Sequence, residues 1–499
     1  MIRPAAQNFH QKALRSFQKG QEDLAIKQFR QAIKQQSRDQ AVWIDFAKVL
    51  TLLFRYSEAS EILKNGIEAF PEPNFINSAL PLLIAARDSA SALKVIEDLP
   101  DPGGLNLIAA DLLERKGDLQ EAADFVGRFE SRGSTIFESQ FLRSKLEFRS
   151  GRYAESLAIL DQILLKGGRQ LSPASLAQVH YARGRDYDRL GEFKRAFEAW
   201  SAAKDVLLPL AGKELDQSNE KFAEDSEMIT RFSPEILREW QSAERKPAKV
   251  LPILLTGFPR SGTTVIEHHL ERSLGIKSAD ENTAFRDLVW RKVFDQVEGT
   301  SDALMSLSKL PVGACMRIRS NYEAALLELS RSPVSARRVI DKNPQLMPLV
   351  VKFLRFFPRM PIIEVVRDPR DVLLSCYGMD FGLNSHSVHY LNSMTAAERI
   401  IGVRGLGMKL RECLGEQMRV IRYEKFVKNP EGEISCLKES LGGETSENTK
   451  AEPSSSARVS YSPTYAEVQK PVYASAVERW KHYEKFFEPA FSKLSDELI

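Results

Sequence analysis

The pattern of hydrophobic and polar positions changes once along the chain, near residue 250. Before that point, large and small apolar residues recur at a fixed interval with glycines in the breaks, which predicts helices stacked in pairs. After it, short apolar runs alternate with stretches of helical spacing, which predicts strands joined by helices. The chain is therefore predicted to be multidomain, with a helical array over 1–210, a charged helical connector over 211–249 and an α/β domain over 250–499.

A repeated order of residues runs through the first part. A small residue follows an inter-helix turn, and 34 positions separate Ala25 from Ala59 and Ala122 from Ser156. The clearest copy reads YARGRDYDRLGEFKRAFEAWSAAK. This order resembles the tetratricopeptide repeat, whose period is about 34 residues, and implies an all-α tetratricopeptide solenoid. We expect five or six hairpins, the third of them, about residues 74–101, shortened.

The array has two alternative roles at this stage. A concave helical surface typically binds a peptide or partner protein, and the array is expected to do so. Alternatively, it packs on the C-terminal domain or pairs two copies of the chain in a homodimer.

The second part of the chain contains four runs with the apolar character of buried strands. They are VLPILLTG, ARRVIDK, MPIIEVV and MRVIRYE, and helical segments separate them. This alternation predicts βαβ units in a mainly parallel sheet. Ligands of such sheets bind at the carboxyl ends of the strands, and the motifs described below follow those ends.

Composition excludes several classes of function. A net charge of +3 is too small to predict nucleic-acid or anionic-membrane binding. The four cysteines form no CxxC pair, which argues against a disulfide framework and a zinc site. Apolar stretches fall short of the roughly 20 residues that span a bilayer. A soluble, cytoplasmic protein is expected.

The segment GFPRSGTT, residues 257–264, follows the first predicted strand and opens a helix. Backbone N–H groups in such a turn, together with the positive end of the helix, favour a bound phosphate. The glycine spacing fits the P-loop pattern GxxxxGK[ST], but Thr263 replaces its lysine and Arg260 lies inside the loop. The missing lysine argues against ATP or GTP hydrolysis, so a P-loop-like site for another phosphate ligand is predicted.

Two further motifs lie at predicted strand ends. VVRDPRDVLLSCY places Arg367 at a strand end and Ser375 on the following helix, a pair suited to a dianionic phosphate. IDKNP places Lys342 after a strand, where its charge can stabilise a developing negative charge. The plainer alternatives are a structural salt bridge for Arg367 and a solvated turn lysine for Lys342. Arg370 and Asp371 are expected to form a surface pair.

In this order, the motifs resemble the sulfotransferases that use 3′-phosphoadenosine 5′-phosphosulfate (PAPS), above all the tyrosylprotein and the repeat-containing bacterial enzymes. The resemblance implies that Arg260 contacts the sulfuryl group and that Lys342 lies at the transfer centre. It places Arg367 and Ser375 at the 3′-phosphate. It also implies a set of 5′-phosphate ligands: Ser261, Gly262, Thr263 and Thr264.

Sulfuryl transfer to a hydroxyl requires a group that accepts the proton. The segment IKSADENTAFRDL resembles the region of the relatives that carries a catalytic glutamate, and matching residue by residue selects Glu281. Asp280 replaces the neighbouring glycine of the family, which leaves the register open by one residue. His268 and His269, on the helix behind the loop, are rival bases.

The C-terminal stretch SYSPTYAEVQKPVYASAVERWKHYEKF is similar to the closing segment of repeat-containing sulfotransferases. The resemblance places Tyr423 and Lys470 at the nucleotide, with Ser462 or Thr464 as further candidates. The polar stretch GGETSENTKAEPSSSA upstream is predicted to be a mobile loop that orders over the bound cofactor.

The predicted function is PAPS-dependent sulfuryl transfer by in-line displacement. Glu281 takes the proton, and Arg260 with Lys342 stabilises the sulfuryl oxygens and the leaving phosphate. Metal is not expected, because no carboxylate set for magnesium accompanies the loop. The acceptor is open among a peptide tyrosine, a glycan and a small molecule, and the repeats favour a macromolecule. The rival functions are a tetratricopeptide scaffold with an inactive transferase domain and a P-loop kinase.

Overall fold

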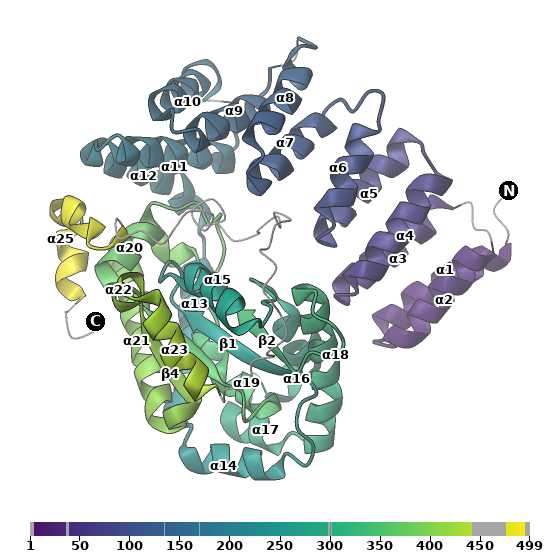
Figure 1. Ribbon diagram of the computed structural model, residues 1–499, viewed down its shortest axis with the longest axis vertical. Helices are drawn as coiled ribbons and strands as arrows, with labels where there is room; N and C mark the ends of the chain where they lie inside the picture. Colours follow the sequence, from purple (N-terminus) through teal and green to yellow (C-terminus); the bar gives the residue numbers. More distant parts are fainter. Residues whose placement is uncertain are drawn as a thin grey trace.

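The computed structural model describes residues 4–35, 39–133, 135–168, 170–297, 300, 302–441 and 476–494. A helical array arches over a domain that contains one sheet (Figure 1). Within the described residues, the first part is all helical and the sheet is four-stranded and parallel, which confirms the predicted fold class.

The described part of the array consists of six helical hairpins. They are α1 (Pro4–Gln18) with α2 (Glu22–Lys34), α3 (Gln40–Leu52) with α4 (Tyr56–Ala69), α5 (Pro73–Ala85) with α6 (Ser89–Glu97), α7 (Leu105–Lys116) with α8 (Leu119–Glu130), α9 (Phe137–Arg149) with α10 (Tyr153–Gly167), and α11 (Pro173–Arg189) with α12 (Phe193–Leu207). In the third hairpin α6 has only nine residues, as its shortened pattern predicts. Membership of the tetratricopeptide family stays a prediction.

Small residues bring the helices of the array together. Five positions that the pattern singles out are fully buried: Ala25, Ala59, Ala122, Ser156 and Ala196. A larger side chain at any of them would push paired helices apart, because protein interiors have almost no spare volume.

The connector is integrated into the core of the α/β domain. After a short 3-10 turn, η1 (Leu208–Leu210), it forms α13 (Glu214–Arg231) and α14 (Pro234–Ala243). Met228, Ile229 and Trp240 are buried in the same cluster as the sheet. The Nζ atom of Lys352 also lies 2.7 Å from Asp225 Oδ1 on α13. These helices therefore cover the domain rather than only linking it to the array.

The sheet contains β1 (Leu251–Gly257), β2 (Arg338–Lys342), β3 (Ile362–Val366) and β4 (Met418–Arg422) in the order β2-β1-β3-β4. Leu255 pairs with Lys342 on one side and with Ile363 on the other. The chain leaves β1 toward β2 and then crosses to β3 on the opposite side. This reversal makes the carboxyl end of β1 a topological switch point, where α/β folds bind ligands.

Helices cover both faces of the sheet. One face packs on α15 (Thr263–Leu274), α22 (Tyr423–Lys428) and α23 (Pro430–Ser440), through residues such as Ile253, Ile266 and Phe426. The other packs on α13, α18 (Val312–Ser330), α19 (Val350–Phe356) and α21 (Ser393–Leu414). The remaining described elements are η2 (Phe285–Trp290), α16 (Arg291–Val297), α17 (Ala303–Lys309), η3 (Met347–Leu349), α20 (Pro369–Tyr377), η4 (Val388–Leu391), η5 (Gly415–Gln417), η7 (Arg479–Tyr483) and α25 (Glu484–Lys493).

The last hairpin of the array is docked on the α/β domain and its C-terminal segment. Asp188 of α11 binds Arg479 at 2.6 Å and accepts a hydrogen bond from Tyr483 at 2.7 Å. Ser201 of α12 lies 3.2 Å from the Tyr377 hydroxyl on α20. The packing on the domain that was given as the alternative role is therefore present, while partner binding by the array stays a prediction.

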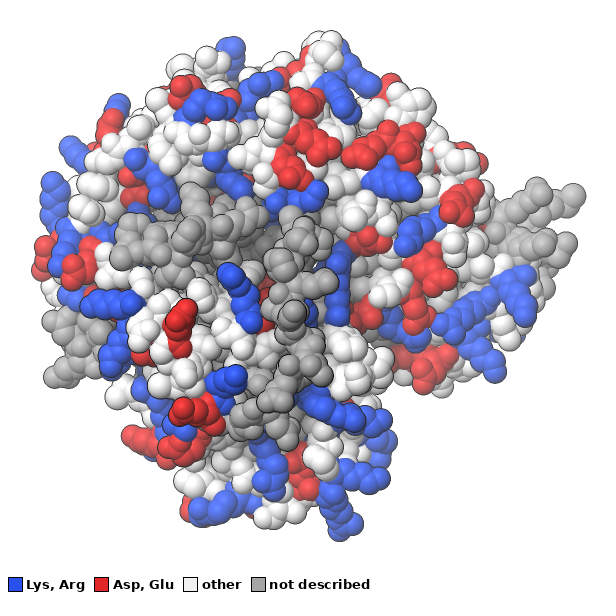
Figure 2. Space-filling view, in the orientation of Figure 1, with Lys and Arg blue, Asp and Glu red and all other residues white. Residues whose placement is uncertain are grey.

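The visible surface carries charges of both signs. Acidic and basic side chains are interspersed over the array and the domain on the face drawn in Figure 2. In the described residues no helix combines the length and apolarity needed to cross a membrane.

Candidate functional site

The loop from Gly257 to Thr264 joins β1 to α15 at the switch point. Gly257 has no room for a side chain, because a Cβ there would lie 2.4 Å from the Val365 carbonyl oxygen. Arg260 and Gly262 have positive φ angles, +69° and +104°. An arginine in this region is strained, and such strain concentrates at functional sites. Two buried threonines, Thr263 and Thr264, then begin α15.

Two side chains of this loop carry groups suited to an anion. The Ser261 hydroxyl is buried, and no hydrogen-bond partner for it is present among the described residues. Arg260 Nε donates a hydrogen bond of 2.8 Å to Ser375 Oγ on α20. A buried hydroxyl without a partner costs free energy, and a bound anion could accept a hydrogen bond from it.

Arg367 lies at the end of β3 against the same loop. One guanidinium nitrogen donates to the Arg260 carbonyl at 3.0 Å, and the other terminal nitrogen donates to the Ala476 carbonyl. Its Nε is buried without a partner in the part of the chain that is described. Arg367 also lies 3.8 Å from Asp371, so the structural salt bridge remains as a partial role.

Tyr423 closes this cluster from the end of β4. Its ring packs on Gly262, where a Cβ would lie 2.3 Å from the ring, and the Arg367 guanidinium is 4.9 Å from the ring centroid. The predicted phosphate ligands thus meet at the carboxyl ends of β1, β3 and β4. We call this group of residues the phosphate cluster: Arg260, Ser261, Gly262, Thr263, Thr264, Arg367, Ser375 and Tyr423.

The predicted surface pair of Arg370 and Asp371 is wrong. Arg370 instead binds Asp368, 2.8 Å away, the residue that caps the N-terminus of α20. Asp371 is buried and accepts backbone hydrogen bonds from Glu478 and Trp480, at 2.8 and 2.9 Å. The two side chains thus have separate partners, one at the start of α20 and the other in the C-terminal segment.

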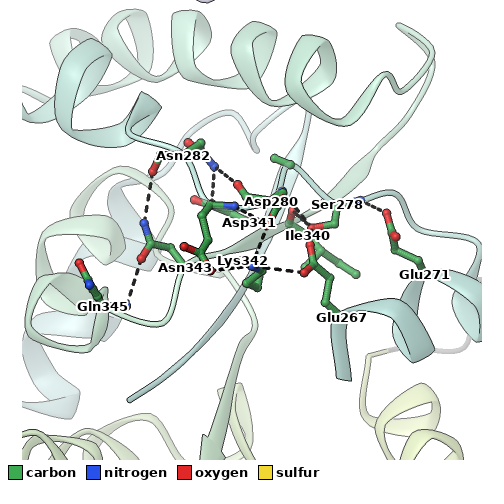
Figure 3. A network of polar contacts seen from close by, with 12 residues as sticks. Glu267, Glu271, Ser278, Asp280, Asn282, Ile340, Asp341, Lys342, Asn343 and Gln345 are labelled. Carbon is green, nitrogen blue, oxygen red and sulfur yellow. Dashed lines mark hydrogen bonds and ion pairs between the residues drawn. The ribbon is translucent and has the colours of Figure 1, made fainter. Parts of the chain in front are cut away.

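Lys342 forms the centre of a second group at the end of β2 (Figure 3). Its side chain is fully buried, which excludes the solvated turn lysine. Its Nζ atom lies 2.7 Å from Asp280, 3.0 Å from Glu281 and 3.4 Å from Glu267. An ammonium has three N–H donors, so these carboxyls can engage all of them. We call these four residues the lysine cluster.

Burial and pairing set the charges of the lysine cluster. Burial opposes the charge of Lys342, but the carboxyls around it outweigh that effect and raise its pKa above the usual value. Burial raises the pKa of Glu267 to about 8, although Lys342 favours its ionised form. The pKa of Asp280 is lowered to about 2, because its contacts with Lys342 outweigh burial. Burial therefore favours the neutral form of Glu267, whereas the contacts with Lys342 favour the ionised form of Asp280.

A wider polar network holds the lysine cluster in place. Asp341 is buried and accepts hydrogen bonds from the Tyr322 hydroxyl and, at 2.9 Å, from the Asn282 side chain. Ser278 donates to Glu267, and the Ser278 amide donates to Glu271 at 2.7 Å. These contacts fix both ends of the segment that carries Asp280 and Glu281.

Exposure separates the candidate bases. The Glu281 side chain is 33% exposed, whereas that of Asp280 is 14% exposed and that of Glu267 is 5% exposed. Asp280 is further held by the Glu281 amide, at 2.8 Å. His269 packs on Phe426, with ring centroids 5.2 Å apart, and His268 is exposed on the same helix. Among these groups, Glu281 combines contact with Lys342 and the greatest exposure to solvent of the three carboxyls.

Some predicted residues lie outside the described part of the chain: Lys470, Ser462, Thr464 and the stretch 442–457. Other residues of the site were not singled out by the sequence, namely Glu267, Tyr322 and Asn282. Glu267 gave a weak signal, because it stands among apolar positions of α15 in TTVIEHHLERSL. In the described residues no group of three or more His, Cys, Asp or Glu side chains is arranged to hold a metal ion, and metal independence stays a prediction.

The chain is similar to two curated proteins. An uncharacterized protein of Aquifex aeolicus is 23% identical over 367 residues, which cover 69% of this chain and 45% of the relative. The nodulation protein NoeE of Sinorhizobium fredii is 24% identical over 219 residues, which cover 38% of this chain and 50% of the relative. The chain thus spans about half the length of the curated relatives it matches.

The chain is also similar to solved structures, with low TM-scores. The sulfotransferase domain of the Synechococcus PCC 7002 olefin synthase is 15% identical, with a TM-score of 0.31, and the match covers 50% of this chain and 98% of that domain. Sulfotransferase STF9 of Mycobacterium avium is 15% identical, with a TM-score of 0.29, over 55% of this chain and 84% of that protein. Residues 252–447, which contain the phosphate cluster and the lysine cluster, match the model of the Sulfotransferase family.

Proposed function

We propose that this chain transfers a sulfuryl group from PAPS to the hydroxyl of a peptide tyrosine or another macromolecule. The observation that carries the proposal is the phosphate cluster at the switch point. There, the buried Ser261 hydroxyl and Arg367 Nε have no partner among the described residues. The family match of residues 252–447 supports sulfuryl transfer.

PAPS carries two phosphate groups, and each needs a binding position in the site. The 5′-phosphate lies on the loop, where Ser261, the loop backbone and the first turn of α15 supply donors. The 3′-phosphate lies at Arg367 and Ser375, beside the Tyr423 ring. Arg260 lies between the two positions through its 2.8 Å contact with Ser375, so it can meet the sulfuryl group. Lys470 is proposed as a further nucleotide contact.

Glu281 is the proposed general base. The acceptor oxygen forms a bond to sulfur while the bond between sulfur and the bridging phosphate oxygen breaks. The acceptor proton passes to the Glu281 carboxylate, and adenosine 3′,5′-bisphosphate leaves. General base catalysis of this kind contributes about 10²- to 10⁴-fold.

Lys342 has two parts in this scheme. Its ammonium orients Glu281 from 3.0 Å and keeps that carboxylate next to the acceptor position. To stabilise a sulfuryl oxygen directly, the ammonium must exchange one carboxyl contact for that oxygen. Glu281 is the carboxyl best placed to give way, because it is the most exposed of the three.

Nucleotide binding tests the donor half of the proposal. Adenosine 3′,5′-bisphosphate is expected to raise the melting temperature of the chain, and ATP with magnesium is expected to do less. If millimolar bisphosphate left the melting temperature unchanged, the transferase function would be rejected. A larger shift with ATP and magnesium would favour the kinase alternative.

Transfer tests the chemical half. Labelled sulfate from PAPS is expected to enter acceptors in a cell lysate, and E281Q is expected to lower the rate about 10²-fold or more. The same variant should keep the melting shift with bisphosphate, because Glu281 lies outside the phosphate cluster. Bisphosphate binding without any transfer by the unaltered chain would favour the scaffold alternative.

A further inference from the structure

The helical array reaches the lysine cluster through one arginine. Arg87 lies in the turn between α5 and α6. Its guanidinium donates to the Glu281 carbonyl at 3.2 Å and to the Ala279 carbonyl at 3.5 Å. These two carbonyls flank Asp280, so Arg87 holds both sides of the turn that presents the proposed base.

The backbone of residues 279–281, to which Arg87 donates its hydrogen bonds, is strained. Asp280 has a φ angle of +41°, a conformation that non-glycine residues rarely adopt. From inside the domain, Ser278 Oγ accepts a hydrogen bond from the Asp280 amide at 3.2 Å. Strained backbone persists only where the surroundings over-determine it, and Arg87 supplies the contact on the array side.

Arg87 is itself held firmly. It has a φ angle of +58°, and its carbonyl accepts a hydrogen bond of 2.9 Å from Arg331 at the end of α18. The next residue, Asp88, caps the start of α6 by accepting from the Ser91 amide. The guanidinium therefore approaches the site from a fixed turn.

Attachment of the array does not depend on Arg87 alone. At this end of the array, Glu22 at the start of α2 binds Lys292 at 3.0 Å, and Ser57 at the start of α4 contacts Glu328 of α18. Figure 1 shows α4 close to α18. At the other end, α11 and α12 dock on α20 and on the C-terminal segment. Arg87 differs from these contacts because it touches the backbone of the proposed base.

We propose that Arg87 is a positioning residue for Glu281, which makes the helical array a component of the transfer site. This inference rests on the proposed function, in which Glu281 accepts the proton. Arg87 fixes the 279–281 backbone so that the Glu281 carboxylate stays beside Lys342. A displacement of about 1 Å in such a group can cost about 10²-fold in rate.

The cation also acts on the electrostatics of the turn. Burial opposes ionisation of Asp280, the contacts with Lys342 reverse this, and Arg87 further lowers the Asp280 pKa. Asp280 in turn lies 2.7 Å from the Lys342 Nζ atom, so the charge of Arg87 acts on the same turn that contacts Lys342.

Amide hydrogen exchange tests whether Arg87 holds the backbone of residues 278–282, and it needs no assay of activity. In R87A, the amides of Ser278, Asp280 and Glu281, which donate to side chains, are expected to exchange about 10-fold faster, because these bonds open more often. R87K keeps one donor and the charge, so it should recover part of the protection. R30A is the matched control, since Arg30 lies in the same part of the array in an exposed pair with Glu58. Unchanged exchange at 278–282 in R87A would overturn the proposal.

Transfer kinetics separate positioning from attachment. With labelled PAPS varied and lysate protein as acceptor, R87A should lower the maximal rate about 10- to 100-fold and leave the KM for PAPS within about 2-fold. A loosened array would instead raise exchange across the first three hairpins and lower the melting temperature. Such an outcome, without a specific effect at 278–282, would contradict a positioning role.

The two proposals fail in different ways. If the unaltered chain neither binds bisphosphate nor transfers sulfate, the proposed function is wrong whatever R87A does. If the unaltered chain is active and R87A matches R30A in rate and exchange, the function stands and the role of Arg87 is wrong.

Discussion

The phosphate cluster and the lysine cluster lie at neighbouring strand ends but are built in opposite ways. In the phosphate cluster, Ser261 Oγ and Arg367 Nε are buried without partners among the described residues. In the lysine cluster, the single ammonium of Lys342 is within 3.4 Å of three carboxyls. One group contains buried donors without a partner among the described residues, and in the other each charged group has a partner.

The difference shows where each part of the site obtains its free energy. Donors without a partner destabilise the unliganded protein, so under the proposed function they would supply affinity for PAPS. In an ion cluster whose members are all paired, the attraction between the charges offsets the cost of removing them from water. Under the proposed function, such a cluster keeps the catalytic groups oriented before the substrate binds. The two clusters should therefore respond differently to substitution.

The largest effect is expected from K342M. Removing one member of a buried ion cluster leaves charged partners uncompensated, and this typically costs about 3–5 kcal/mol of unfolding free energy. Transfer activity should be lost as well, because Glu281 loses its orienting contact. Urea unfolding measures the stability. The control is K277M. Lys277 is exposed, and its substitution should change the unfolding free energy by less than about 0.5 kcal/mol.

An equal loss in K342M and K277M would show that the lysine cluster does not stabilise the fold. In that case the contrast between a completed cluster and an open one would be lost.

R260G is expected to separate activity from stability in the phosphate cluster. Glycine adopts a φ of +69° without strain, which offsets the lost contact with Ser375. The unfolding free energy should stay within about 1 kcal/mol of that of the unaltered chain. Transfer should fall about 10²-fold, because a charge that stabilises the sulfuryl group is gone. A loss of stability comparable to that of K342M would mean that Arg260 serves the fold and not the ligand.

The sequence predicted the residues of the phosphate cluster more completely than those of the lysine cluster, and the reason is physical. The phosphate cluster depends on one continuous loop and on residues at strand ends, so local spacing reveals it. The lysine cluster depends on contacts between distant segments. Glu267 resembles an ordinary polar position of α15 until Ser278 and Lys342 are placed against it. Arg87 lies in a region whose pattern predicts partner binding, and only the docked array brings it to Glu281.

The fold was predicted more completely than the site. Each predicted strand and the helix after the loop appear, because buried strands and turn glycines are local signals. The integration of 211–249 into the core was not anticipated, since its charged surface masks the buried face of α13 and α14. Likewise, the wrong pairing of Arg370 with Asp371 arose from reading sequence neighbours as spatial neighbours.

A pH dependence of stability is expected from the lysine cluster. Burial raises the pKa of Glu267 from 4.5 to about 8, so between these values the folded chain keeps a proton that the unfolded chain releases. Stability due to this group is therefore greatest at low pH and falls as pH rises, by up to about 1.4 kcal/mol per unit. E267Q cannot titrate. The difference in unfolding free energy between E267Q and the unaltered chain should shift in favour of E267Q from pH 5.5 to 7.5.

Urea unfolding at three pH values in this window measures that difference. Two parallel curves would show that Glu267 has an ordinary pKa, and the assignment of charges within the lysine cluster would have to change.

The smallest effect, and the most specific one, is expected from S261A. Deleting a buried hydroxyl that lacks a partner removes a desolvation cost, so the unliganded chain should be as stable as before or more stable by up to about 1 kcal/mol. Affinity for adenosine 3′,5′-bisphosphate should nevertheless fall about 10-fold, because one hydrogen bond to the ligand is lost. S273A, at an exposed position of α15, is the control and should change neither quantity. Calorimetric titration with the bisphosphate, combined with melting curves, gives both values on the same samples.

If S261A instead destabilised the unliganded chain and bound the bisphosphate normally, the hydroxyl would have a partner within the fold. The phosphate cluster would then be as complete as the lysine cluster.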